Sequence, residues 1–255
     1  MIFLAFDAGA SKGGFAAVRA TREPDGFRFA CLRHAHVDLM LDGAEREALA
    51  VSTLIGLFEW ALTVRDGAEP IVVVVEGVEG FVYAGRSSTH LFDTADQAGG
   101  IRLCARTWAR MRGVPGFSVK RTTASAVRKF LFGKERGVGD NEVVLTVRGC
   151  VSGMPPLRVP VPDERTAEGK AIHSYDAAAI ALVEAAKAFG LPRITLPNAV
   201  LVDIAKYRAA GATRESEKKA RAALREAGVK LPRAQSRHTR RRRSEAATAA
   251  ARRAS

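Results

Sequence analysis

The sequence predicts an α/β fold, and three observations lead to it. The apolar run Ile2 to Phe6, a glycine-containing loop and the run Phe15 to Arg19 form the pattern of a β-hairpin at the start of the chain. Ile71 to Val75 is an uninterrupted β-branched run, which is typical of a strand buried on both faces of a mixed or parallel sheet. Strand and helix patterns then alternate. We therefore expect a sheet flanked by helices.

The elements between and after these strands follow from periodicity. A third strand is predicted around Phe27 to Val37. Two amphipathic helices are predicted over Glu45 to Val64 and Thr94 to Arg112. In the first helix, the side chains expected in the core are Leu49, Leu54, Leu57, Trp60 and Ala61. In the second, an apolar face is expected from Ile101, Cys104, Trp108 and Met111, and a basic face from Arg102, Arg106 and Arg110.

The C-terminal half of the main domain contains shorter patterns. Phe117 to Lys120 is predicted as a strand and Ala124 to Phe132 as a short basic helix. Asn141 to Cys150 fits either a helix or a strand. Ala171 to Phe189 is alanine-rich and is followed by glycine and proline at the positions where helices stop, so it is predicted as a helix.

Composition and charge suggest two parts. We predict a main domain over residues 1–195 and a basic extension over 196–255, with charged helical segments over 199–228 and a low-complexity tail after them. The net charge is +13, and residues 211–255 hold 14 Lys/Arg against 4 Asp/Glu. Residues 102–136 hold 10 basic side chains and one acid. Such a distribution is typical of a protein that neutralises phosphates, although a basic tail can also be simply a solvated segment.

Other features narrow the class of protein. No stretch of about eighteen apolar residues occurs, and the N-terminal segment lacks the pattern of a secretion signal, so we expect a cytoplasmic protein without membrane insertion. Three widely spaced cysteines fit reduced thiols better than disulfides or a zinc site.

Three acids and one histidine form the candidate catalytic group. Asp7 ends the first strand and Glu76 ends the buried strand. His173 and Asp176 are three residues apart, which places them on one helix face. Individually, Asp7 could start a turn and Asp176 could complement a helix dipole. The combination favours a shared site.

Crowded carboxylates repel one another unless a cation lies between them. Mg²⁺ and Mn²⁺ prefer oxygen ligands, and a pair of such ions can activate water and stabilise the leaving oxygen of a phosphodiester. We therefore expect Mg²⁺ or Mn²⁺, with two ions per active site, and hydrolytic strand cleavage. His173 could complete the ligand set or act on the attacking water.

The order and setting of these residues resemble the RuvC-type Holliday-junction resolvases of the RNase H-like class. The resemblance is carried by FDAGASKGGFAAV around Asp7, VVVVEGVEGFV around Glu76 and HSYDAAAIAL from His173, and it extends over about residues 1–190. DQAGG from Asp96 and the basic segment VRKFLFGKERGVGD agree with it. It implies a mixed five-stranded sheet, metal and catalytic roles for Asp7, Glu76, His173 and Asp176, and a homodimer that nicks four-way DNA junctions symmetrically.

The same resemblance suggests DNA contacts. Phe81, or alternatively Tyr83, is expected to stack at the junction centre. Basic residues of the matching segment are expected to hold phosphates, and Asn141 stands close to where the family often has a lysine. The predicted DNA-binding residues are Phe81, Tyr83, Arg86, Arg128, Lys129 and Lys134.

Three other functions fit parts of the sequence. FDAGASKGG also resembles the first phosphate-binding hairpin of actin-like and sugar-kinase-like ATPases, but a second phosphate loop and an adenosine motif are not found. An RNase H-fold nuclease acting on flaps, RNA hybrids or a viral replication intermediate is a second alternative. A DNA-binding module with a degenerate nuclease fold is the third.

Overall fold

A computed structural model describes residues 1–8, 13–37, 44–77, 88–133, 138–154 and 169–209. Residues Met1–Tyr207 form one compact unit, and Arg208–Ser255 form a second. The division predicted after residue 195 stays a prediction. Among the described residues, none of the helices combines the length and the apolar character needed to span a bilayer.

The sheet has six strands in the order β5-β4-β1-β2-β3-β6. The first three strands in sequence are antiparallel neighbours, and β4 and β5 are added in parallel on the other side of β1. Five strands correspond to the predicted mixed sheet, and the two-residue β6 extends it beside β3. Their bounds are β1 Ile2–Asp7, β2 Gly13–Glu23, β3 Gly26–Val37, β4 Ile71–Glu76, β5 Phe117–Thr122 and β6 Val151–Ser152.

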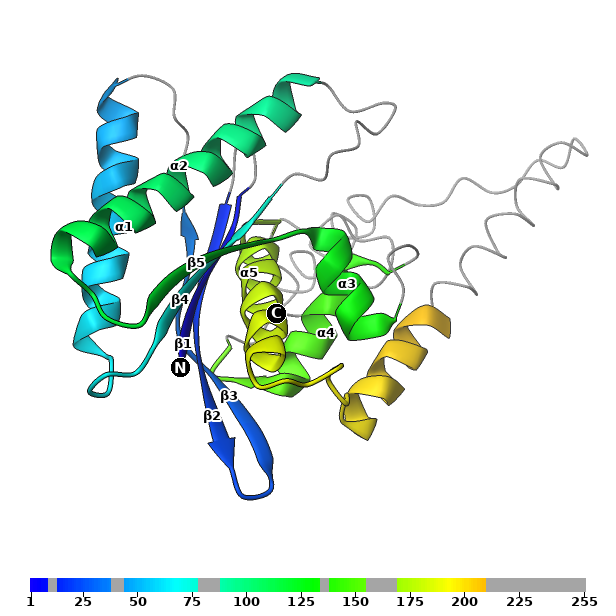
Figure 1. The fold of residues 1–255 in the computed structure, drawn as a ribbon. Coiled ribbons are helices and arrows are strands. Elements are labelled where there is room, and N and C mark those ends of the chain that lie inside the picture. The colour runs from blue at the N-terminus through cyan, green and yellow to red at the C-terminus, as the bar shows by residue number, and fades with distance from the viewer. Residues whose placement is uncertain (9–12, 38–43, 78–87, 134–137, 155–168, 210–255) are drawn as a thin grey trace, which may run out of the picture. The chain divides into compact units, whose positions relative to one another are not determined.

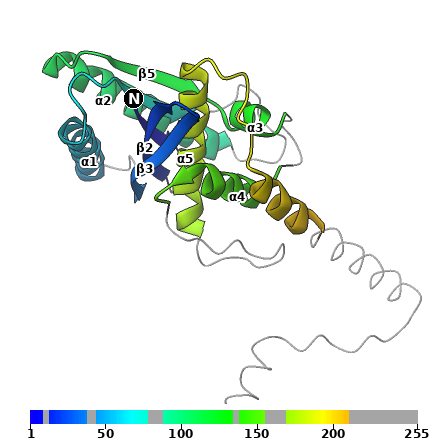
Figure 2. The same ribbon diagram turned by 90° about the horizontal axis from the view of Figure 1, so that it is seen from below.

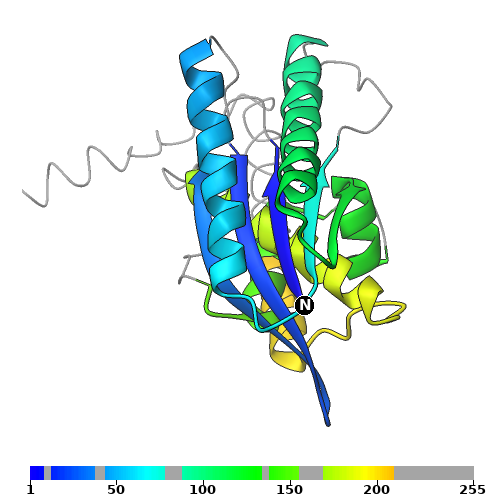
Figure 3. The same cartoon turned by 60° about the vertical axis from the view of Figure 1, so that its left-hand side comes forward.

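Helices cover both faces of this sheet. The helices α1 and α2 lie over one face (Figures 1 and 3). The helix α5 packs against the other face, with α3 and α4 on its outer side (Figure 2). This arrangement confirms the predicted α/β fold class, a mixed sheet flanked by helices. The bounds are α1 Ala44–Thr63, α2 Ser88–Arg112, α3 Ala124–Phe132, α4 Asp140–Cys150 and α5 Gly169–Ala188, and a further helix covers residues 198–209.

Two hydrophobic cores result from strand alternation. Successive side chains of a strand point to opposite faces, so Phe3 and Ala5 of β1 enter the core under α5. Leu4 and Phe6 enter the core under α1 and α2. Because every residue of β1 is buried, the strand is fixed on both faces. The strand ends are therefore rigid supports for any side chains placed there.

Three details differ from the sequence-based expectation. The helix α2 begins at Ser88, six residues before the predicted start. Leu49 and Met111 are 68% and 82% exposed, so their predicted core positions are wrong. Leu49 precedes the buried Ala50 and lies about 100° around α1 from it, off the face that the helix buries. Met111 lies near the end of α2, where helix periodicity continues but the sheet no longer provides a partner.

The segment left open between helix and strand is the helix α4. Its first turn is stabilised by Glu142, whose carboxylate accepts a hydrogen bond from the Gly139 backbone N–H at 3.3 Å. This capping contact satisfies one of the backbone donors that a helix N-terminus leaves unpaired. Val143, Val144 and Val147 then face the core under α5.

Candidate active site

Asp7 and Glu76 meet because their strands are parallel neighbours. The register pairs Phe6 of β1 with Val75 of β4, which places the next residue of each strand at the same edge of the sheet. Alternation puts both carboxyl groups on the α5 side, since Ala5 and Val74 point into the core under that helix. The sequence predicted each acid at a strand end, and the pairing of β1 with β4 brings them together.

The helix α5 reaches this edge by packing closely on β2. Gly14 pairs with Asp7 across the hairpin. A Cβ at Gly14 would overlap the carbonyl group of His173 and would lie 2.7 Å from the Ser174 backbone nitrogen. Only a residue without a side chain permits this approach, so Gly14 sets the position of His173 beside Asp7.

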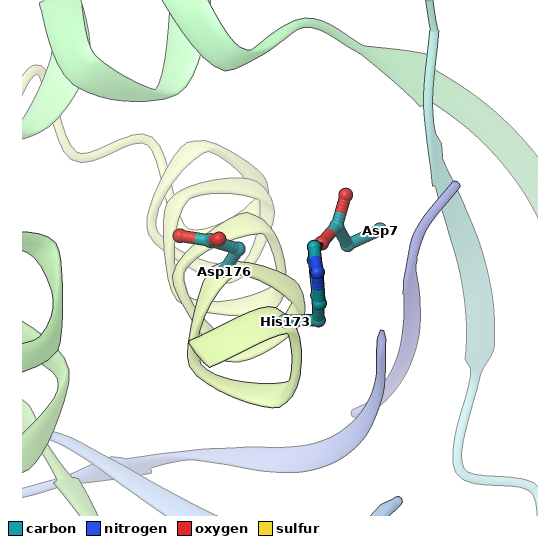
Figure 4. A group of neighbouring side chains, drawn as sticks. All are labelled: Asp7, His173 and Asp176. Carbon is teal, nitrogen blue, oxygen red and sulfur yellow. Dashed lines mark hydrogen bonds and ion pairs between the residues drawn. The ribbon is translucent and has the colours of Figure 1, made fainter. Parts of the chain in front are cut away.

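Three of the four predicted residues form a compact donor group. Asp7, His173 and Asp176 each offer one ligand atom, and these atoms lie within 4.8 Å of one another. Figure 4 shows the His173 ring beside the Asp7 carboxyl group, with Asp176 on the same end of α5. The fourth residue, Glu76, ends the strand next to that of Asp7, and the charges of Asp7 and Asp176 act on its pKa. The structure thus brings all four together.

The histidine is oriented by Asp7. His173 Nδ1 lies 2.6 Å from Asp7 Oδ2, a distance that fits donation of the Nδ1 proton to the carboxylate. A neutral ring in this tautomer carries its lone pair on Nε2. The imidazole can therefore act as a metal ligand or as a base while Asp7 holds its orientation.

Burial and charge repulsion both raise the pKa values of acids in this group. Burial, with the hydrogen bond to Asp7 and the charges of Asp7 and Asp176, raises the pKa of Glu76 well above its usual value. Burial and the charges of Asp7 and Asp140 raise the pKa of Asp176 to about 8, although His173 and Arg128 act in the opposite direction.

Arg128 borders the group from α3. Its guanidinium donates to Asp140 Oδ1 at 2.9 Å, and its charge lowers the pKa of both Glu76 and Asp176. The pair links the helices α3 and α4 next to the carboxylates. Asp140 was not predicted as a site residue, because nothing in its local sequence distinguishes it from an ordinary acid in the first turn of a helix.

Of the other predicted DNA-binding residues, one lies in the part of the chain that the structure describes and four lie outside it. Lys129 is exposed on α3, one residue after Arg128. DNA binding by Arg128 and Lys129 stays a prediction. The remaining predicted residues lie outside the part of the chain that the structure describes, and they are Phe81, Tyr83, Arg86 and Lys134.

Replacing Gly14 with alanine is expected to displace the site residues on α5. The added methyl group must push α5 away from β2, which displaces His173 and Asp176 from Asp7. A misplacement of about 1 Å can reduce a catalytic rate about a hundredfold. We expect Gly14→Ala to show a loss of this size, together with a lower melting temperature.

The matched control is Gly56→Ala in the exposed part of α1, where an added Cβ meets nothing within 4 Å. Alanine favours a helix over glycine by about 1 kcal/mol, so this variant is expected to keep its activity and gain stability. Equal activities of the two variants would contradict the positioning role of Gly14.

This chain resembles known proteins in its structure, whereas searches with its sequence find no match. No protein-family model matches the sequence, and no curated protein matches it either. A structure of Thermus thermophilus RuvC aligns with a TM-score of 0.49 and 20% identity, covering 74% of this chain and 97% of that one. The same protein in complex with a Holliday-junction substrate aligns with a TM-score of 0.48 and 21% identity over the same shares. The yeast mitochondrial Holliday-junction resolvase aligns with a TM-score of 0.44 and 13% identity, covering 72% and 77%.

Proposed function

We propose that this protein is a divalent-metal-dependent endonuclease that cleaves branched DNA. The observation that carries the proposal is the convergence of ligand atoms of Asp7, His173 and Asp176 within 4.8 Å, with Glu76 at the end of the neighbouring strand. Folding alone does not favour such a group, because bringing ionised carboxyl groups together in a partly buried place costs free energy. A site that binds cations explains why the cost is tolerated.

The donor set fits Mg²⁺ or Mn²⁺. Asp7 and Asp176, with Glu76 at the neighbouring strand end, supply carboxylate oxygen atoms, which both ions prefer, and one imidazole is compatible with Mn²⁺. Asp7, His173 and Asp176 would hold one ion, and Glu76 with Asp7 would hold a second. Bound there, the ions would lower the pKa of water and offset charge on the phosphodiester.

The chain's own residues would perform the remaining tasks. Asp7 fixes the orientation of the His173 ring and leaves the Nε2 lone pair of the neutral ring directed away from Asp7, where it would serve as the metal ligand. Arg128 lies close enough to the carboxylates to act on their charges, and a guanidinium there can hold a phosphate through two hydrogen bonds. A fixed cation of this kind also stabilises negative charge that develops on the phosphate during cleavage.

We propose four-way junctions as the substrate and a homodimer as the active form. Two identical active sites related by a two-fold axis match the symmetry of a junction that is cut on two strands. The exposed apolar side chains Leu103 and Met111 of α2 are compatible with a partner surface. Light scattering in solution measures the mass, and a monomer at the concentrations that cleave would contradict the dimer.

Cleavage of an immobile four-way junction in Mg²⁺ and in Mn²⁺ tests the proposed function. Duplex, flap and RNA:DNA hybrid of matched sequence serve as competing substrates. Paired, symmetric nicks restricted to the junction are expected. Metal-dependent cutting of another substrate would support the nuclease chemistry and overturn the junction assignment, and absence of cutting on every substrate would overturn the nuclease proposal.

Deleting residues 234–255 is expected to weaken DNA binding and to flatten its dependence on salt. The deleted segment holds seven arginines and one acid, and each phosphate neutralised contributes about 0.9 to the slope of log affinity against log salt. Fluorescence anisotropy across a KCl series measures this slope. An unchanged slope would show that these arginines do not contact DNA.

A further inference from the structure

Arg121 lies at the same sheet edge as the carboxylates but belongs to the opposite face. It is the next-to-last residue of β5, and its backbone pairs with Val75, one residue before Glu76. Phe117 and Val119 pack toward the core under α1 and α2, so strand alternation directs Arg121 to that side as well. The Arg121 side chain is exposed.

The neighbouring Lys120 shows the contrast between the two faces. Its ammonium lies 3.9 Å from the buried Glu184 carboxylate of α5, which places it on the α5 side. Glu184 also accepts a hydrogen bond from Lys187 at 2.6 Å. Lys120 therefore contributes to the attachment of α5 to the sheet.

Gly77 provides the space that Arg121 occupies. A Cβ at Gly77 would overlap Arg121 Nε and would lie 2.8 Å from its Cδ and 2.9 Å from its Cγ. The backbone here is fixed, because the Gly77 N–H donates to the Thr122 carbonyl at 2.8 Å. The guanidinium stem thus lies directly on the backbone that follows Glu76, and this contact limits where the charged end can be.

We propose that Arg121 is a second phosphate-binding residue at the active centre, held in place by Gly77 and contacting the DNA strand on the side opposite Arg128. This inference rests on the proposed function. Arg128 acts on Glu76 from α3, and Arg121 lies beside the next residue of the same strand from β5. A strand whose scissile phosphate meets the carboxylates extends to both sides, and a cation on each side can hold the flanking phosphates.

Four variants of the full-length chain test the proposal: Arg121→Ala, Arg121→Lys, Gly77→Ala and the double variant Gly77→Ala/Arg121→Ala. Junction binding is measured in EDTA over a KCl series, and melting temperatures are measured in parallel. The matched control is Arg22→Ala, an exposed strand arginine next to the β2–β3 turn.

Arg121→Ala is expected to weaken binding about tenfold and to lower the salt slope by about 1, as loss of one phosphate contact requires. Gly77→Ala should weaken binding similarly, because the methyl group displaces the arginine. The double variant should bind no more weakly than Arg121→Ala, because both changes remove the same phosphate contact. Arg121→Lys should retain the slope, and Arg22→Ala should match the wild type.

An unchanged salt slope in Arg121→Ala would overturn the inference, as would strictly additive losses in the double variant. A change in melting temperature with no change in slope would also overturn it, because it would assign Arg121 a structural role. Cleavage by the wild-type protein in Mn²⁺ is scored separately. If the wild type cuts and Arg121→Ala keeps its slope, the inference fails alone; if nothing is cut but the slope falls, the nuclease proposal fails and the DNA contact stands.

Discussion

Asp7→Asn, Glu76→Gln and Asp176→Asn are each expected to reduce the cleavage rate about a thousandfold or more, with DNA binding retained within a few-fold. Each change removes a charged oxygen donor from the group that would hold the ions, while the amide keeps the size of the side chain. The phosphate contacts proposed here come from arginines and not from these acids. Single-turnover cleavage of the junction in Mg²⁺ and a binding titration in EDTA separate the two effects.

The control for this series is Asp25→Asn, an exposed acid in the turn between β2 and β3. It changes the net charge by the same amount without touching the site, so it is expected to cut at the wild-type rate. A wild-type rate in any of the three site variants would remove that residue from the catalytic group. Loss of binding together with cleavage would indicate that the carboxylates maintain the fold of the DNA surface.

Much of the fold was predictable because the hydrophobic periodicity of the sequence is clear in most elements. The β-branched run Ile71 to Val75 has few alternatives to a central strand, and α3 matches the predicted bounds Ala124–Phe132. The amphipathic pattern of α2 continued beyond the contact region, however, which is why Met111 was wrongly placed on the packed face. Periodicity reports which face of a helix is apolar and does not report where its partner ends.

The sequence indicated the positions of the four candidate residues but not their contacts. Strand ends and an i, i+3 helix pair are visible in the sequence, whereas the parallel pairing of β1 with β4 is a long-range property. Gly14 looked like one of several loop glycines, and only the packed helix shows that its missing side chain admits His173. The pair of Arg128 with Asp140 similarly depends on how α3 and α4 meet.

These contacts place a source of instability at the centre of the site. Asp7 is buried at the end of a fully buried strand, and Glu76 and Asp176 are held near it although their charges repel. An acid that served only the fold would gain a cationic partner, as Glu184 does with Lys187. The repulsion among these carboxylates is instead reduced by charges outside the group. A bound cation would reduce it the most.

Asp176→Asn is therefore expected to stabilise the metal-free protein at alkaline pH. The folded-state pKa of Asp176 is about 8, against an ordinary 3.8, so this group contributes stability that is complete at low pH and is lost as pH rises toward 8. Asparagine removes this loss, which we expect to amount to about 2–4 kcal/mol near pH 8. For a chain of this size that corresponds to about 5–10 °C in melting temperature.

Melting curves in EDTA at pH 5 and pH 8 check this expectation, with Asp25→Asn as the control. At pH 5 Asp176→Asn should still melt above the wild type, but by less than at pH 8, because the unfolded Asp176 is already ionised above its ordinary pKa of 3.8 while the folded group keeps its proton. Mn²⁺ should raise the melting temperature of the wild type more at pH 8 than at pH 5, since a cation replaces the proton, and should raise that of Asp176→Asn less. If Asp176→Asn melts below the wild type at pH 8 in EDTA, the Asp176 carboxylate stabilises the fold, and its place beside Asp7 needs no bound cation to explain it.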